Sequence, residues 1–444
     1  MKKPELLAPA GTLKNMRYAL AYGADAVYAG QPRYSLRVRN NDFNHMDNLA
    51  LGIAETHAQG KQFFVAANIS PHNSKLKTFM DDLAPIIALN PDALIMADPG
   101  LIMWVRERWP DMPIHLSVQA NTVNYAAVQF WQKLGLSRVI LSRELALDEV
   151  KEIRQQCPDI ELEVFVHGAL CIAYSGRCLL SGYLSHRDPN QGSCTNTCRW
   201  DYKAHPAAED ETGDIQIAQP VLTTAAQATD QVFLLEEHNR PGEYMPAFED
   251  EHGTYIMNSK DLRAVQHVAE LIDIGVDCLK IEGRTKSHYY AARTSQVYRH
   301  AIDDAMAGKS FDFGLMDELE NLANRGYTEG FYRRHLPQEY QNYEQGISRS
   351  DRQQFVGEIL SADEDWLEVD VKNHFEVGDQ FELMLPGFCH NFSLEAMQDK
   401  ERQNITVAKG SGHIVWIPKP AEVKDIAYGL LLRDLKQDWR EPVA

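Results

Sequence analysis

Short apolar runs rich in β-branched and aromatic residues alternate along the chain with longer segments of helical periodicity. This alternation is typical of βαβ units, in which parallel strands are joined by helices. We expect strands at residues 5–10, 26–30, 63–68, 93–98, 114–120, 138–142, 162–168 and 279–284. Eight such units predict a TIM-barrel-like (β/α)8 domain, and residues 255–259 are a further strand candidate.

Two of the expected strands divide by parity into a polar and an apolar face. In the strand at 114–120 and the residue after it, the polar face consists of His115, Ser117, Gln119 and Asn121. In the strand at 279–284, it consists of Lys280, Glu282 and Arg284. Alternate side chains of a closed barrel face its interior. These polar groups are therefore expected inside the barrel and toward its carboxyl-terminal mouth, where such barrels place their active sites.

Two regions depart from the βα pattern. Residues 199–253 are acidic and loop-rich, so we expect a cysteine-rich and acidic insertion at about 169–254 within a barrel domain of residues 1–340. Beyond residue 343, short alternating strands and turns predict a small all-β, barrel-like C-terminal domain at 352–444.

The balance of charge narrows the partners that the chain is expected to bind. A net charge of −19 argues against indiscriminate coating of nucleic acid, which depends on neutralising phosphates. One local basic patch is a candidate RNA-binding site, and it combines Arg33, Arg37 and Arg39 with Tyr34. The alternative is a set of ordinary solvated arginines. There is no apolar run of about 20 residues and no signal-peptide pattern, so a cytoplasmic protein is expected.

Four of the seven cysteines fall within 28 residues, at Cys171, Cys178, Cys194 and Cys198. Free thiols, metal ligation or redox work are expected of an odd number of cysteines in a large cytosolic chain. Buried unlinked thiols, a four-cysteine zinc site and a 4Fe–4S cluster are the three interpretations. The spacing alone leaves zinc and the cluster comparable.

The segment EVFVHGALCIAYSGRCLLS at 163–181 resembles, position by position, the signature of peptidase family U32. The matching positions are Glu163, Phe165, Gly168, Cys171, Gly176, Cys178 and Ser181. Further blocks that resemble the family are GADAVYAG (23–30), LSVQANT (116–122), NQGSCTNTCRW (190–200), SKDL (259–262) and KIEGR (280–284). The resemblance therefore covers nearly the whole chain.

The resemblance implies a 4Fe–4S cluster held by Cys171, Cys178, Cys194 and Cys198, of which Cys198 is replaced by another ligand in some relatives. It also implies an activity, the hydroxylation of the wobble uridine of tRNA to 5-hydroxyuridine. That reaction is prephenate-dependent and needs no molecular oxygen. tRNA and a small dicarboxylate, prephenate, are then the expected partners.

Candidate site residues follow from combining the family's chemistry with the parity of the strands. Arg284 is the first choice for binding a carboxylate, and the other substrate-binding candidates are Lys280, Gln119, Asn121 and Asn68. Glu282 and His167 are candidates for the catalytic groups.

Two other classes of function stay open. A peptidase would need a cysteine nucleophile paired with His167, since neither an H-E-x-x-H nor a G-x-S-x-G motif is present. A non-catalytic RNA-binding accessory factor would need the basic patch but no cluster.

Overall fold

A computed structural model describes eleven segments of the chain, and it describes the five between 202 and 254 by their backbone. The segments are residues 2–31, 33–36, 41–170, 202–209, 215–217, 232–237, 244–250, 253–254, 260–324, 326–333 and 352–435. The strand candidate at 255–259 lies outside them.

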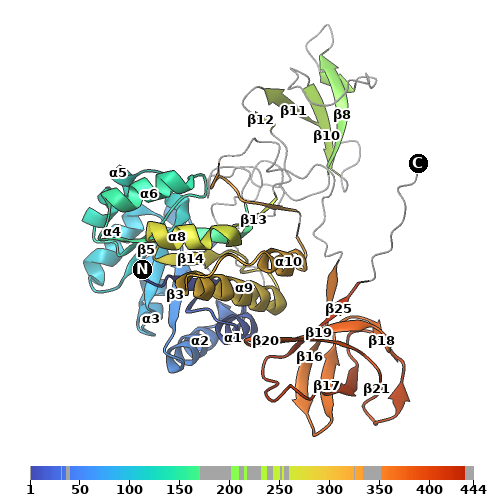
Figure 1. Cartoon of the computed structure of the whole chain (residues 1–444). Coiled ribbons are helices and arrows are strands. Elements are labelled where there is room, and N and C mark those ends of the chain that lie inside the picture. The colour runs from blue at the N-terminus through green and yellow to red at the C-terminus, as the bar shows by residue number, and fades with distance from the viewer. Residues whose placement is uncertain are drawn as a thin grey trace.

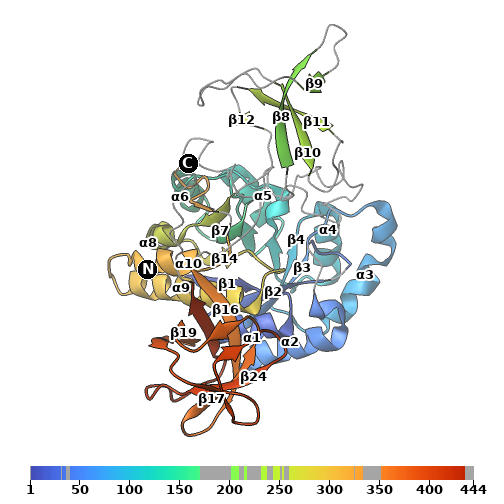
Figure 2. The ribbon, with the colours of Figure 1, turned by 90° about the vertical axis from the view of Figure 1, so that its right-hand side faces the viewer.

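Eight parallel strands form the closed barrel that the sequence predicts (Figures 1 and 2). In order around the barrel they are β1 (Glu5–Pro9), β2 (Ala26–Gly30), β3 (Gln62–Ala67), β4 (Ala93–Met96), β5 (Ile114–Leu116), β6 (Arg138–Ile140), β7 (Glu161–Ala169) and β14 (Cys278–Ile281). The last strand pairs in parallel with both β1 and β7, and this pairing closes the sheet.

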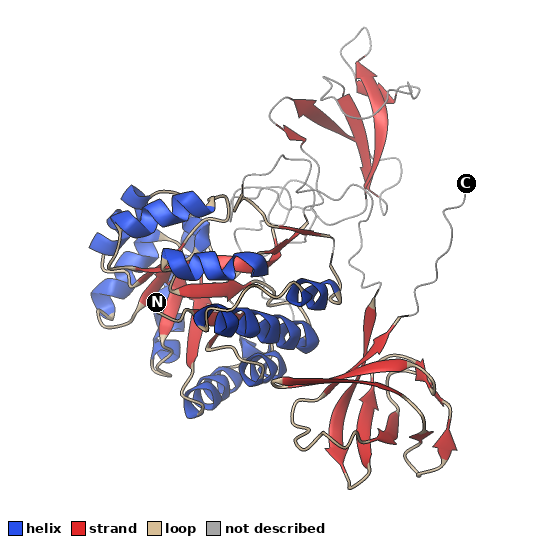
Figure 3. Cartoon of the chain, viewed as in Figure 1, coloured by secondary structure: helices blue, strands red, loops and turns tan. Residues whose placement is uncertain are grey.

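Helices surround the barrel on its outside (Figure 3). They are α1 (Leu13–Ala21), α2 (Met46–Ala58), α3 (Asn73–Ile87), α4 (Pro99–Arg108), α5 (Tyr125–Lys133), α6 (Leu147–Gln156), α8 (Val268–Ile274), α9 (His288–Met306) and α10 (Gly314–Glu320). Polar side chains cap several of them: Thr12 accepts from Asn15 N at the start of α1, and Ser287 accepts from Tyr290 N at the start of α9.

Neighbouring residues of β3 show how strand parity builds the two layers. Phe63 faces outward, where its ring packs 5.6 Å from that of Phe43, just before α2. Phe64 faces inward, where its ring lies 4.7 Å from His115. The outward apolar side chains bury the inner faces of the helices, while the interior of the barrel also accepts polar groups.

The barrel strand expected at 114–120 is shorter than its polar pattern suggests. It ends at Leu116, and residues Val118–Ala120 form the 3-10 turn η2, which Asn121 closes in a left-handed conformation with φ 50°. The alternation of faces therefore stops at Ser117, and Asn121 is not on a strand face shared with His115.

Two very short strands extend the barrel sheet beyond β7. They are β13 (Asp261–Arg263), antiparallel to β7, and β15 (Tyr327–Thr328), parallel to β13. Neither was expected, because two or three residues are too few to show a periodicity.

The insertion contains regular structure where the sequence suggested loops. Its strands are β8 (Tyr202–Glu209), β9 (Ile215–Ile217), β10 (Val232–Glu237), β11 (Tyr244–Asp250) and β12 (Gly253–Thr254). They pair in an antiparallel sheet that stands away from the barrel in both ribbon views (Figures 1 and 2). The acidic, loop-rich composition of residues 199–253 had suggested loops instead of these strands.

The C-terminal domain is all-β, as expected. Its strands are β16 (Gln353–Ala362), β17 (Trp366–Val371), β18 (Phe375–Glu376), β19 (Gln380–Leu385), β20 (Phe388–Ser393), β21 (Met397–Gln398), β22 (Asn404–Ile405), β23 (Val407–Ala408), β24 (Ile414–Pro418) and β25 (Leu430–Asp434). Every strand pairing recorded in the domain is antiparallel, and the strands enclose their own apolar core.

Polar and apolar contacts join the two domains. Arg293 of α9 pairs with Glu382 of β19 at 2.5 Å, and the Tyr22 hydroxyl donates to the carbonyls of Met384 and Tyr428. Apolar side chains of β19 and β25 also belong to the core of the barrel domain. Among the described residues, we find no helix with the length and apolar character that crossing a bilayer requires.

Candidate functional site

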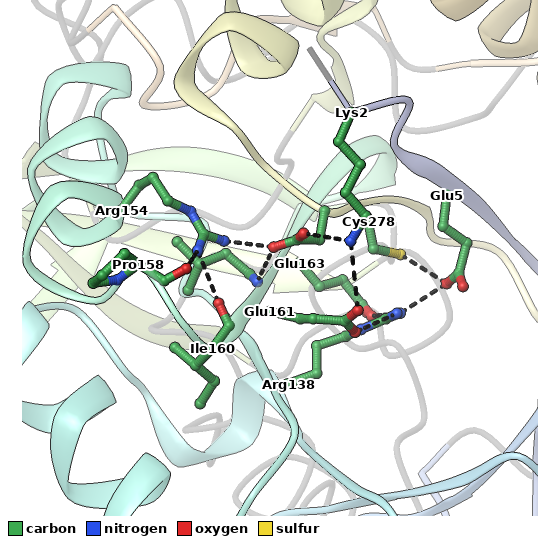
Figure 4. A network of polar contacts seen from close by, with 11 residues as sticks. Lys2, Glu5, Arg138, Arg154, Pro158, Ile160, Glu161, Glu163 and Cys278 are labelled. Atoms are coloured by element: carbon green, nitrogen blue, oxygen red, sulfur yellow. Dashed lines mark hydrogen bonds and ion pairs between the residues drawn. The ribbon is translucent and has the colours of Figure 1, made fainter.

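A ladder of buried charges occupies the barrel interior near its amino-terminal end (Figure 4). Arg138 Nη1 lies 2.7 Å from Glu5 and 3.2 Å from Glu163. Lys280 Nζ lies 2.7 Å from the other oxygen of Glu163, and the Cys278 thiol contacts Glu5 at 3.3 Å. Lys280 therefore pairs with Glu163 of β7, a residue that the parity argument did not consider.

Each buried charged group of the ladder lies beside a group of opposite charge, and this pairing stabilises the charges. Burial opposes ionisation of Glu163, but the adjacent Lys280 and Arg138 outweigh it and lower the pKa of the carboxyl. Burial lowers the pKa of Lys280, an effect that the ion pair with Glu163 opposes. Burial also moves the pKa of His115 well below its usual value, so its ring is neutral. A paired interior network of this kind accounts for Lys280 without a ligand.

Arg284 lies beyond the ladder, after the last residue of β14 and at the carboxyl-terminal mouth. It is buried, its Nη1 donates to Ser35 Oγ at 2.6 Å, and its guanidinium carbon is 5.6 Å from the centre of the Tyr28 ring. Gly30, the last residue of β2, leaves the room for it, since a Cβ at Gly30 would lie 2.7 Å from Nη1. Arg284 is thus buried at the mouth, but the strand expected at 279–284 ends at Ile281, so Arg284 lies in the turn after β14 and not on a strand face shared with Lys280.

Glu282 is also buried, and it directly follows Ile281, the last residue of β14. Its Oε2 accepts a hydrogen bond from the Tyr28 hydroxyl at 3.2 Å, and its carbonyl accepts one from Tyr290 at 2.7 Å. Lys280 Nζ lies 4.3 Å from the centre of the Tyr28 ring. The Tyr28 side chain thus contacts Glu282 through its hydroxyl, and Lys280 and Arg284 through its ring. The ring separates the paired ladder from the mouth.

The neutral substrate-binding candidates are partly brought together. Asn68, which follows β3, donates to Ser117 Oγ at 3.1 Å and to Gln119 Oε1 at 3.0 Å. Its Oδ1 accepts from Leu36 N at 3.2 Å. Asn68 and Gln119 therefore form one amide cluster at neighbouring strand ends, whereas Asn121 occupies the turn described above.

His167 lies on β7 under α9, surrounded by tyrosines. Its ring centre is 5.8, 5.6 and 5.4 Å from those of Tyr290, Tyr298 and Tyr327. Burial is the largest effect on this histidine, and together with nearby cations it lowers the pKa to about 3. Its Nε2 is buried without a hydrogen-bond partner among the described residues. At neutral pH the ring is uncharged.

Arg143 is a cationic residue of the mouth that sequence reasoning missed. Its guanidinium carbon lies 3.8 Å from the centre of the Phe165 ring, and its Nη1 donates to the carbonyl of Ala169, the last residue of β7. Lys280 Nζ is 5.5 Å from the same ring. Its position in the sequence could have indicated it, because Arg143 directly follows the expected strand at 138–142 and barrel active sites form at the carboxyl ends of strands.

In the candidate RNA-binding patch, the Tyr34 ring is buried and is not available to stack on a base. That side chain is 1% exposed, and its hydroxyl is bonded to Asp82 at 2.7 Å and to Thr78 at 3.0 Å on α3. Arg33 is half exposed but pairs with the same Asp82 at 2.9 Å. Helix α3 packs against the loop and so buries the ring. Arg37 and Arg39 lie outside the described residues.

The four clustered cysteines, Cys171, Cys178, Cys194 and Cys198, also lie outside the described residues. Strand β7 ends at Ala169, so Cys171 follows two residues after the carboxyl-terminal rim. Within the described segments, Cys157, Cys278 and Cys389 are free thiols, and no group of three or more metal-binding side chains occurs there.

Comparison with known proteins places the chain in a family. The model of peptidase family U32 matches residues 11–342, and the model of its C-terminal domain matches residues 351–433. The chain belongs to peptidase family U32. The curated and solved relatives in this family extend the comparison.

One similar relative is the tRNA hydroxylation protein P of Escherichia coli, 63% identical over 98% of this chain and 97% of the relative. Another is the Escherichia coli 23S rRNA 5-hydroxycytidine synthase, 28% identical over 86% of this chain and 52% of the relative. The solved U32 peptidase Mk0906 is 15% identical, with a TM-score of 0.33 over 38% of this chain and 70% of that one.

Proposed function

We propose that this protein hydroxylates tRNA. The observation that carries the proposal is the 63% identity, over nearly the full length of both chains, to a protein named for tRNA hydroxylation. A relative named for making 5-hydroxycytidine in ribosomal RNA supports the same class of reaction, hydroxylation of a pyrimidine in RNA.

The finer proposal is 5-hydroxylation of the wobble uridine, prephenate-dependent and independent of molecular oxygen. A dicarboxylate needs fixed cationic donors, and the mouth provides two guanidinium groups, Arg284 against Tyr28 and Arg143 against Phe165. The planar fork of an arginine matches a carboxylate through two charge-assisted hydrogen bonds. In this proposal Arg284 binds one carboxylate and Arg143 the other.

The resident cofactor in this proposal is a 4Fe–4S cluster ligated by Cys171, Cys178, Cys194 and Cys198. The donor chemistry fits, because four cysteine thiolates are the usual ligands of such a cluster and the first of them follows β7 at the mouth. When bound, the cluster supplies a redox or Lewis-acid centre for chemistry without molecular oxygen.

The chain's own side chains then position the reactants. Arg284 is anchored by Ser35 and stacked beside Tyr28, so it is oriented before a ligand arrives. The carboxylate of Glu282, which accepts from Tyr28, is our candidate for holding or moving a proton at the mouth. Asn68 and Gln119 add neutral hydrogen-bonding groups from the segments that follow β3 and β5.

The peptidase alternative is disfavoured by the environment of His167. A general base that activates a thiol must take up a proton near neutral pH. Burial lowers the pKa of His167 to about 3, and tyrosine rings enclose it. His167 therefore suits a neutral structural role between β7 and α9 better than that of a general base.

Nucleoside mass spectrometry of tRNA from a strain lacking the gene tests the proposal. We expect 5-hydroxyuridine and its derivatives to be lost from tRNA, and to return with the wild-type gene on a plasmid. An unchanged nucleoside profile in a strain with no second copy of the gene contradicts the proposal.

A further inference from the structure

A groove separates the barrel rim from the C-terminal domain. It encloses about 580 Å³ and is lined from both sides. Lys286, Ser287, Tyr289 and Tyr290 contribute from the start of α9, and Gln353, Gln354, Phe355, Asn373 and Arg433 from the β domain. Asn321, Leu322, Ala323 and Leu435 complete the lining. This volume is within the range of small-molecule and nucleotide sites.

The composition of the lining is unusual for so acidic a protein. The chain has 63 acidic and 44 basic residues, yet among the described residues that line the groove there are two cations and no carboxylate. Four side-chain amides supply both hydrogen-bond donors and acceptors: Asn321, Gln353, Gln354 and Asn373. An anion that also presents polar edges is the ligand that such a surface favours.

The two cations lie on opposite domains. Arg433 of β25 donates from Nη2 to Gln354 Oε1 at 2.8 Å, and its Nη1 lies 3.4 Å from Asp379 Oδ2. These two contacts fix the direction of the guanidinium group. Lys286 belongs to the barrel side, where its Nζ is 5.4 Å from the centre of the Tyr290 ring. Between them Tyr289 and Phe355 stack at 5.5 Å with an interplanar angle of 12°, forming an aromatic wall.

The groove is linked to the candidate active site by the segment that follows β14. Lys286 comes two residues after Arg284, and the Tyr290 hydroxyl donates to the carbonyl of Glu282. This adjacency is the reason to consider the groove as a place for the nucleotides next to a target base that enters the mouth. Single-stranded RNA offers phosphates for the cations, base edges for the amides and ring faces for the aromatic wall.

We propose that this groove binds the single-stranded nucleotides that flank the target base of the RNA substrate. The inference rests on the proposed function, and it assigns to the C-terminal domain a direct part in holding the substrate. Lys286 contacts a backbone phosphate from the barrel side, and Arg433 contacts one from the β domain.

The test measures binding of unmodified tRNA to the full chain, by fluorescence anisotropy, as salt is raised. Each phosphate contact contributes about 0.7 to the slope of log affinity against log salt for single strands. We expect Lys286→Ala to reduce the slope by about 0.7 and to weaken binding about fivefold at roughly 0.1 M salt. Adding Arg433→Gln should reduce the slope further.

The matched control is Lys309→Ala, which removes the same charge just beyond the other end of α9, where Lys309 pairs with Asp304 and is largely exposed. This variant should bind tRNA like the wild type. Equal affinities and slopes for wild type and Lys286→Ala overturn the groove proposal, and they do so even where deletion of the gene abolishes tRNA hydroxylation.

Competition separates RNA from an acidic protein partner. Poly(U) should displace labelled tRNA from the wild type and do so less well from Lys286→Ala. Displacement by polyglutamate with the same sensitivity to Lys286→Ala, and none by poly(U), overturns the assignment to RNA. Intact tRNA binding through the groove in a protein that modifies no tRNA would contradict the proposed function alone.

Discussion

Arg284 owes its orientation to a close fit with neighbouring strands. The guanidinium donates to Ser35, lies beside the Tyr28 ring and passes over Gly30, where a side chain would collide with it. A group fixed in this way loses little conformational entropy when a ligand binds. The predicted role of the residue therefore depends on its planar fork as well as on its charge.

The first prediction is that Arg284→Lys keeps the fold but loses most tRNA hydroxylation. Lysine retains the charge but not the bidentate geometry, so prephenate should bind more weakly by about 1.5–3 kcal/mol, the usual contribution of hydrogen bonds to a charged group. Calorimetric titration measures this. Arg17→Lys, at the partly exposed ion pair with Glu55, is the control and should behave as wild type. Full activity of Arg284→Lys would place the carboxylate elsewhere.

A second prediction concerns Gly168, where β7 comes closest to the turn after β14. Its φ is +103°, and a Cβ there would lie 2.5 Å from the carbonyl oxygen of Glu282. Gly168→Ala should lower the free energy of unfolding by about 3 kcal/mol or more, because backbone strain and a backbone clash add together.

Gly60 provides the control for this substitution. It also has a positive φ, +67°, but nothing lies within 4 Å of its added Cβ. Gly60→Ala should cost only the strain, about 1–2 kcal/mol. Urea denaturation of both variants separates the effect of the clash from that of the strain. Equal losses in the free energy of unfolding at the two positions would show that β7 shifts at Gly168 and relieves the clash.

At the scale of elements, we expect the contact between α9 and β16 to depend on pH. Glu358 of β16 lies 2.5 Å from Lys14, 3.1 Å from His288 and 3.5 Å from Lys372. Burial opposes ionisation of this carboxyl, but the neighbouring His288 and Lys14 outweigh it and lower the pKa to about 2, from an ordinary 4.5.

A carboxyl group whose pKa is lowered by folding stabilises the folded state at any pH above its pKa in the unfolded chain. This contribution should be complete above about pH 4.5 and disappear as the pH falls toward about 2. We therefore expect Glu358→Gln to be less stable than the wild type near neutrality, with the difference shrinking over that window. Exposed Glu401→Gln is the control. A difference that stays constant with pH contradicts the linkage.

The sequence predicted best those elements that carry an apolar run of their own. All eight barrel strands were located, because each carries an apolar run of its own. The strand from Ile114 was drawn too long, since polar alternation continued through a 3-10 turn. The short β13 and β15 were missed, because few residues take part and their partners are distant in the sequence. The sheet of the insertion was missed because its acidic, loop-rich composition suggested loops.

The candidate site was predicted in part for similar reasons. Arg284 and Glu282 lie buried at the mouth as expected, but β14 ends at Ile281, so the turn after the strand places them and strand parity does not. Parity could not assign Lys280 to Glu163, which comes from another strand, nor show that α3 covers Tyr34. Contacts between elements are fixed by packing, and a pattern within one element carries no information about them.

At the scale of the whole molecule, the proposed cluster predicts a colour and a metal content. Protein purified without oxygen should be brown and hold about four irons per chain. Cys171→Ala, Cys178→Ala and Cys194→Ala should each lose most of the iron. The controls are Cys157→Ala and Cys389→Ala, at thiols outside the four proposed ligands. Stoichiometric zinc without iron would rule out the cluster, and full iron in Cys198→Ala would reassign only the fourth ligand.

The most direct measurement is the amount of 5-hydroxyuridine in tRNA from cells grown without oxygen. The strain lacks the gene and carries on a plasmid the wild type, Arg284→Lys or Cys171→Ala. The account predicts that the wild type restores the nucleoside under anaerobic growth and that both variants leave it near the level of the deletion. Restoration only in the presence of oxygen, or full restoration by both variants, would contradict it.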